Sequence, residues 1–177
     1  KIIKFFPVEV ASCKERLSAY GKDIKTVKEN TKPNTDGFTP IELKGIVYND
    51  KKEAGTELLT ICSCKVNADK ESIGKYKGLN LDLEFDKFSR TFILGLEGKQ
   101  RYSVELGKDI FGNIQRIDNF LEALPMRENN CKQKLEELEK QLETAKVEVK
   151  KEFEKEDELV EKSKRLDELN LLLNEDN

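Results

Sequence analysis

The chain has 177 residues, of which 38% are charged and 37% hydrophobic, and its formal net charge is −3. This length can hold one domain, or one domain plus an appendage, and the low hydrophobic share predicts a segment with much surface and little core. The acidic balance excludes binding of nucleic acid through bulk positive charge, so any DNA contact must come from a local patch. The absence of histidine excludes Ser-His and Cys-His nucleophile systems.

The sequence predicts a cytoplasmic location. It contains no hydrophobic run long enough to span a bilayer, and it shows no secretory signal at its start. Because it begins with Lys1 and its only methionine is Met126, we expect a piece of a larger protein. A zinc site would need all four cysteine thiolates, brought together from three distant segments. We therefore predict no cofactor and interpret the cysteines as free, mostly buried thiols: Cys13, Cys62, Cys64 and Cys131.

Residues 1–32 are predicted to form an amphipathic helix. Apolar side chains recur from Val10 to Val27 at intervals of three and four residues, which places them along one face of a helix. The following stretch, 30–37, contains Asn, Thr, Pro, Asp and Gly and is predicted to be a loop.

Residues 38–124 are predicted to form an α+β head domain. Two short strands, 41–43 and 46–48, flank a tight turn, and Asp50 opens a capping box that starts a helix. The segment 79–86 alternates strictly between apolar and polar residues, as a strand does when one face is buried and the other wet. Together with the two segments that follow it, this strand predicts a small antiparallel sheet, a three-stranded meander plus the short hairpin. A helix that ends near Pro125 would cover the dry side. The two further strands are 91–96 and 101–106.

Residues 125–177 are predicted to form a long antiparallel helical hairpin, a coiled coil. Apolar residues recur there with heptad spacing among Glu and Lys. The stripe is interrupted between Phe153 and Asp157, where we expect the chain to fold back on itself. A homodimer through the same residues is the alternative. The predicted seam consists of Leu135, Leu138, Leu142, Ala145, Val149, Leu159, Leu166, Leu169 and Leu173.

Basic side chains around the predicted turns are the candidate DNA contacts. The segment 74–78 lacks the strand-loop-helix context of a phosphate-binding loop and is predicted to be a turn leading into the long strand. Its tyrosine would stack on a base while the flanking lysines contact phosphate. The other candidates lie at strand ends, where solvated charge without a binding role is the preferred interpretation. The full set is Lys75, Tyr76, Lys77, Lys87, Arg90, Lys99, Arg101 and Lys108.

The polar face of the long strand carries side chains of the kinds that support metal binding or catalysis. Aligned carboxylates can bind a metal or transfer protons. On an exposed sheet face they usually only keep the surface soluble, and this is the interpretation we prefer for Asn80, Asp82, Glu84 and Asp86.

Three segments resemble the extreme C-terminal region of very large DNA methyltransferase–helicase proteins of Gram-positive conjugative elements. They are 104–119 (VELGKDIFGNIQRIDN), 141–151 (QLETAKVEVKK) and 165–174 (RLDELNLLLN). The resemblance covers most of the chain from Phe38 onward and is weakest in the first helix. It implies an accessory region of a DNA-modifying protein, and it assigns no catalytic residue here. The methylation motif and the Walker loop of that family are absent from this sequence.

Two functions follow as expectations. The first is a non-catalytic module that helps the parent protein recognise or position DNA. The second is a module that docks on the remainder of the parent polypeptide, or on another protein, through the predicted hairpin. An independent enzyme is not expected, because the sequence offers no recognisable nucleophile, phosphate-binding or metal-binding set.

Overall fold

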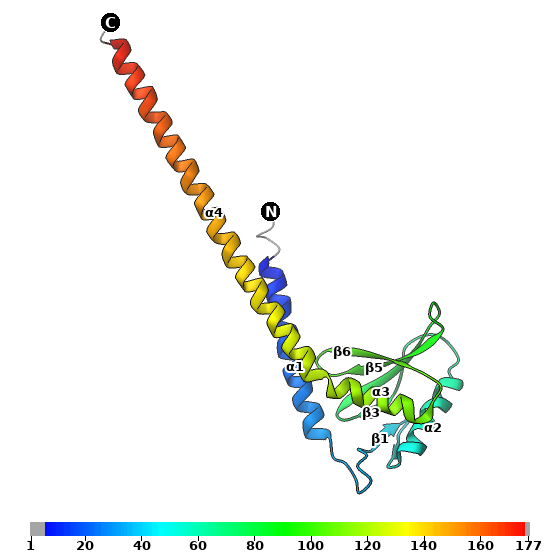
Figure 1. Ribbon diagram of the computed structural model, residues 1–177. Helices are drawn as coiled ribbons and strands as arrows, with labels where there is room; N and C mark the ends of the chain where they lie inside the picture. The colour runs from blue at the N-terminus through cyan, green and yellow to red at the C-terminus, as the bar shows by residue number, and fades with distance from the viewer. Residues whose placement is uncertain (1–5, 176–177) are drawn as a thin grey trace. The chain divides into compact units, whose positions relative to one another are not determined.

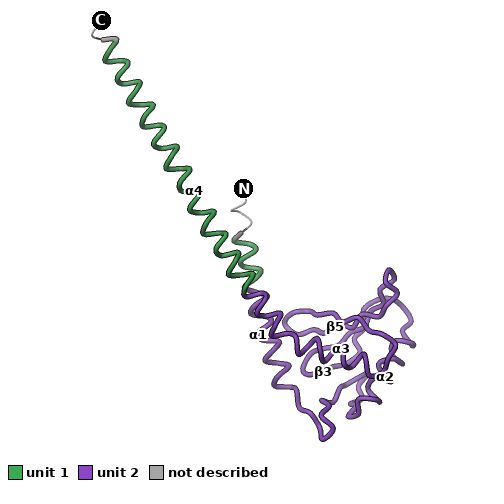
Figure 2. Tube along the Cα trace, in the orientation of Figure 1, with its two compact units in different colours: residues 1–13, 133–177 green, residues 14–132 purple. Residues whose placement is uncertain are grey.

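The computed structural model describes residues 6–175 of the chain, which divide into two compact units (Figure 2). We call residues 14–132 the head unit, and residues 6–13 together with 133–175 the helical unit. Two helices contribute to both units, α1 (Phe6–Asn30) and α4 (Leu124–Glu175). Residues 1–5 of the predicted first helix and residues 176–177 of the predicted hairpin lie outside the described residues.

The head unit contains one six-stranded antiparallel sheet (Figure 1). Its strands are β1 (Ile41–Leu43), β2 (Ile46–Tyr48), β3 (Glu71–Tyr76), β4 (Leu79–Asp86), β5 (Thr91–Glu97) and β6 (Arg101–Leu106). In space their order is β2-β1-β3-β4-β5-β6. The predicted α+β class is confirmed, and the predicted meander and short hairpin belong to the same sheet.

β3 is a strand where the sequence analysis predicted only a turn. It pairs with β1 on one side and with β4 on the other, so it joins the short hairpin to the meander. Gly74 permits this pairing, because a Cβ at that position would lie 1.8 Å from the backbone oxygen of Glu42. An irregularity in register between Ser72 and Gly74 breaks the alternation of side chains along the strand. The strand therefore lacks the pattern by which β4 was recognised.

Two hairpins of the sheet turn through a pair of residues with positive φ. Lys44 and Gly45 connect β1 to β2 with φ of 53° and 82°, and Lys77 and Gly78 connect β3 to β4 with φ of 49° and 82°. Positive φ at both central residues is typical of type I′ turns, whose twist matches that of the flanking strands. The predicted turn at Lys44 and Gly45 is confirmed, and the turn predicted over 74–78 is confined to its last residues.

One face of the sheet carries the hydrophobic core of the head unit. Leu81, Leu96 and Tyr102 are buried there and lie opposite one another across β4, β5 and β6. Two helices, α2 (Lys51–Ser63) and α3 (Ile110–Glu122), cover this face and pack on each other. Three half-buried side chains of α1 pack against the same cluster, namely Tyr20, Ile24 and Val27.

Both covering helices begin at an aspartate that caps the helix N-terminus. The Asp50 carboxylate accepts from the Glu53 backbone N–H at 3.1 Å, as the capping box predicted. The Asp109 carboxylate accepts from the Gly112 N–H at 2.8 Å in the same way. These caps fix where α2 and α3 start against the sheet.

The predicted helical hairpin is wrong, because α4 is one continuous helix from Leu124 to Glu175. The segment 153–157, Phe-Glu-Lys-Glu-Asp, interrupts the apolar stripe but contains no Gly or Pro to break the helix. In the helical unit the beginning of α1 lies beside α4 instead, and the two run in opposite directions (Figures 1 and 2). The buried side chains of this pairing are Val10 and Cys13 from α1 and Leu135 and Leu138 from α4.

Along the part of the chain that the structure describes, no helix combines the length and the apolar character that crossing a membrane requires.

Candidate interaction surfaces

The predicted base-stacking tyrosine is buried. Tyr76 is 1% exposed, and its hydroxyl donates a hydrogen bond to the Asp118 carboxylate at 2.6 Å. Burial, and after it the hydrogen bond to Asp118, raises the pKa of Tyr76 above its ordinary value. The Lys77 ammonium lies 3.2 Å from the same carboxylate and 5.2 Å from the centre of the Tyr76 ring. The expectation that Tyr76 and Lys77 project together into solvent is therefore wrong, because α3 supplies a carboxylate that holds both.

The second correction concerns the polar face of β4. Asp82 was predicted to be wet, yet it is 4% exposed. The Arg101 guanidinium donates to both of its carboxylate oxygens, at 2.5 and 2.7 Å. The hydrogen bond to Asp82 raises the pKa of Arg101 above its ordinary value. Gly95 leaves room for this pair, because a Cβ there would lie 2.3 Å from an Asp82 oxygen. Arg101 is thus neutralised within the sheet by a bidentate contact.

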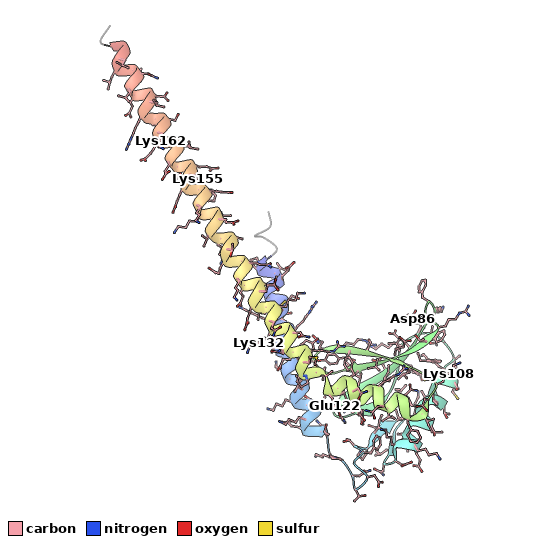
Figure 3. All side chains as sticks on the ribbon, viewed as in Figure 1. Asp86, Lys108, Glu122, Lys132, Lys155 and Lys162 are labelled. Carbon is pink, nitrogen blue, oxygen red and sulfur yellow. The ribbon has the colours of Figure 1, made fainter. Side chains whose placement is uncertain are left out.

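The remaining basic candidates are exposed but separated. The register of the sheet places the β3–β4 and β5–β6 turns, with Lys77 and Lys99, at one end. The β4–β5 turn, with Lys87 and Arg90, lies at the other end, where Lys108 follows β6 (Figure 3). On the polar face between these ends, Lys75 lies opposite Glu42 in register. The eight predicted contacts therefore do not form one positive patch.

A buried carboxylate that the sequence analysis did not single out holds one of these turns. Asp23 of α1 is 1% exposed and accepts from the backbone N–H groups of Lys99 and Gln100 at 2.6 and 3.1 Å. It also accepts from the Tyr102 hydroxyl at 2.7 Å, and burial followed by this bond raises the pKa of Tyr102. Since these donors use both oxygens, the carboxylate has a structural role. In the sequence, Asp23 is visible only as one charged residue beside the apolar stripe of α1.

The tip of the β4–β5 hairpin is the most exposed aromatic site of the head unit. Phe88 is fully exposed, and it stands between Lys87 and Arg90 in sequence. Its backbone N–H donates to the Asp86 side chain at 3.0 Å, which fixes the turn. A shallow groove lined by Lys87, Phe92 and Val66 lies beside it. The two basic residues were predicted as contacts from the sequence, and the phenylalanine between them was not.

The four cysteines lie in different surroundings. Cys62 is buried in α2, and burial raises the pKa of its thiol to about 11. Cys64 is exposed, Cys13 is buried and Cys131 is half-buried. Among residues 6–175 no group of three or more Cys, Asp or Glu side chains is arranged to hold a metal ion.

The predicted seam divides into two parts along α4. Leu135 and Leu138 are each 9% exposed, and Leu142, Ala145 and Val149 are half-buried. From residue 150 to residue 173 every side chain is exposed. The exposed leucines of the seam are Leu159 at 66%, Leu166 at 61%, Leu169 at 55% and Leu173 at 64%.

The exposed part keeps the heptad spacing of the buried part. With Leu138 and Ala145 as the d positions, the next d positions are Glu152, Leu159 and Leu166. Four further large apolar side chains of the same half are also more than half exposed: Phe153, Val160, Leu171 and Leu172. A helix that carries this much apolar surface in water is typical of a docking surface.

Comparison of the chain with known protein families, with curated proteins and with solved structures found no match.

Proposed function

We propose that this chain is a non-catalytic protein-interaction module, and that the C-terminal half of α4 is its docking surface. One observation carries the proposal: leucines spaced by seven residues, Leu159 and Leu166, remain about two-thirds exposed on a continuous helix. Each would gain stabilisation from burial against a partner helix, on the order of 2 kcal/mol.

The surface of the head unit supports this proposal over DNA recognition. A DNA-binding face requires exposed Lys and Arg side chains gathered on one side. Here Arg101 and Lys77 are paired with carboxylates, and the exposed candidate lysines are distributed over the two ends of the sheet and the polar face between them. We retain the larger DNA methyltransferase–helicase as the proposed parent, on the resemblance of residues 104–119, 141–151 and 165–174. The module would then dock a helix within that assembly.

The test is association of this chain through the seam, measured both with the parent polypeptide lacking the corresponding region and with a second copy of the chain. A double variant, Leu159→Asp with Leu166→Asp, should abolish the binding. The matched control, Leu171→Asp with Leu172→Asp, makes the same chemical change at positions that are equally exposed but outside the heptad seam. Binding that survives the first variant, or that is lost equally in both, would refute the proposal.

One observation favours a second function, a weak contact with single-stranded nucleic acid at the β4–β5 tip. A fully exposed Phe88 between Lys87 and Arg90 offers a ring for stacking and two charges for phosphate. Phe88→Ala should weaken binding to an oligonucleotide about tenfold, in line with the stacking energy of one base. Val66→Ala, which removes a neighbouring exposed side chain, is the control. Absence of salt-sensitive binding by the unaltered protein would remove this candidate.

A further inference from the structure

We propose that the helix docking on the exposed seam belongs to a second copy of this chain, and that the two pair as a parallel, in-register coiled coil over residues 159–173. This inference rests on the proposed function and names its partner. The segment is helical throughout, so the partner need not fold it on binding.

The identity of the core positions favours a self-complementary pairing. Leu159 and Leu166 occupy d positions, while Ser163 and Asn170 occupy the intervening a positions. In a parallel in-register pair each layer contains the same residue twice, so leucine faces leucine and Asn170 faces Asn170. In an antiparallel pair, a positions face d positions, and every layer would set a polar side chain against a leucine. The parallel arrangement alone separates the apolar layers from the polar ones.

Asn170 is a second argument for this arrangement. A single asparagine at an a position specifies the register and the two-stranded state of a parallel coiled coil, because the two amides hydrogen-bond to each other. Its presence costs stability, since a polar group is taken out of water. In a pair of identical helices, each Asn170 amide has the other as its hydrogen-bond partner, and the pair fixes the register.

The charges beside the seam are complementary in the same arrangement. Lys162, labelled in Figure 3, occupies a g position, and Asp167 occupies the e position of the next heptad. In parallel coiled coils g of one helix contacts the following e of the other. A twofold axis therefore produces two Lys162–Asp167 pairs, one on each side of the dimer. The contacts are at the surface and set the alignment more than the affinity.

The seam also limits how far the pairing extends. Glu152 and Glu156 occupy the d and a positions that precede Leu159. Two carboxylates facing their copies would repel, so the proposed segment begins after them. About two heptads remain, and a coiled coil this short is weak. We expect a dissociation constant on the order of 100 µM for the chain alone.

The first experiment measures self-association by sedimentation equilibrium from about 1 µM to 1 mM, a range chosen to bracket that constant. The unaltered protein should pass from monomer to dimer. The Leu159→Asp/Leu166→Asp variant should remain monomeric, and Leu171→Asp/Leu172→Asp should associate as the unaltered protein does. Circular dichroism checks that both variants keep their helix content. A chain that stays monomeric, or a dimer insensitive to the first variant, overturns the inference.

The second experiment tests direction and register. Ser163→Cys at the a position should form an intermolecular disulfide on mild oxidation, because two a positions of a parallel pair face each other. Lys164→Cys, one residue further and outside the seam, is the control, and both are made with Cys64→Ser. We expect Ser163→Cys to crosslink at least about tenfold faster, since pairing raises the local thiol concentration. Equal rates overturn the parallel in-register arrangement.

The two proposals fail separately. If the chain remains monomeric but binds the parent polypeptide through Leu159 and Leu166, the proposed function stands and the second copy is excluded as the partner. If neither association depends on these leucines, both are excluded. Asn170→Leu adds a positive readout: self-association should tighten about tenfold as the polar layer is lost, and species larger than dimers should appear.

Discussion

Leu94 in the sheet of the head unit and Leu166 in the second half of α4 are the same side chain in opposite environments. Leu94 is fully buried, and Leu166 is 61% exposed. The head unit satisfies its side chains internally, and among the described residues every buried side-chain nitrogen or oxygen has a hydrogen-bond partner. Along α4, apolar residues also recur with heptad spacing, but beyond Val149 they stay exposed. Periodicity thus specifies which side chains will be buried, without specifying whether the burying surface belongs to the same chain.

The largest expected effect is the loss of stability caused by truncating Leu94, the buried leucine. Leu94→Ala should lower the free energy of unfolding by about 3 kcal/mol, because it leaves a cavity in a closely packed core. Leu166→Ala removes the same atoms from an exposed site and should change it by less than about 0.5 kcal/mol. Urea denaturation at low micromolar concentration measures both. Equal losses would contradict the division into a packed head and an exposed seam.

A smaller loss of stability is expected from removing the carboxylate that holds the β5–β6 turn. Asp23→Ala leaves two backbone N–H groups and the Tyr102 hydroxyl without their acceptor, at a cost of about 2–3 kcal/mol. Tyr102→Phe removes only one of these bonds and should cost about 1 kcal/mol. The measurement is again chemical denaturation. A variant Asp23→Ala as stable as Tyr102→Phe would show that water replaces the carboxylate.

Alkaline pH should destabilise the head unit and leave the exposed half of α4 unaffected. The pKa of Cys62 is raised by burial to about 11, and those of Tyr76 and Tyr102 are raised as well. A group whose pKa is higher in the folded state contributes stability that is complete below its unfolded pKa and lost as the pH rises through the folded value. For Cys62 this window runs from the ordinary value of 9.0 to about 11.

The urea midpoint should therefore hold steady from pH 7 to 8 and fall between pH 9 and 11. In the variant Cys62→Ala part of that fall should disappear, because the buried thiol no longer titrates. A midpoint that is equal at pH 8 and pH 11 in the unaltered protein would contradict the prediction.

The smallest expected effect is a difference in amide hydrogen exchange between the sheet and the exposed half of α4. In hydrogen exchange, the amides of β4 and β5 should be protected to nearly the global free energy of unfolding. Those of residues 150–173 should exchange through local fraying, with protection that increases as the protein concentration is raised. Fast exchange that does not depend on concentration would count against self-association and would leave the head-unit prediction intact.

The sequence predicted the parts of the fold in which one local pattern decides the structure. The alternation of β4 and the capping aspartate of α2 are of this kind. β3 was missed because the irregularity at Gly74 removes its alternation, and the hairpin was predicted because a polar interruption in the stripe was taken for a break in the backbone. The error at β3 could not be corrected from the local sequence, since the pairing of β3 with β1 and β4 is a property of the assembled sheet.

The candidate site was predicted less well, for a related reason. Tyr76 was placed at the surface by its neighbours in sequence, but its partner Asp118 is 42 residues away. Arg101 was chosen for its charge, which Asp82 on β4 cancels across the intervening strand β5. The leucines of the seam were predicted to be buried against a second helix. Leu135 and Leu138 are buried, and a partner for the exposed leucines stays a proposal.

The Asp23 contact affects the order in which parts of the chain fold during synthesis. Its donors are Lys99, Gln100 and Tyr102, which lie 76 to 79 residues downstream. While the ribosome is still producing the middle of the sheet, α1 already carries a carboxylate whose three donors do not yet exist. The Asp23 carboxylate therefore stays hydrated until β6 has left the exit tunnel, so this contact, which joins the beginning of the head unit to its last strand, forms late.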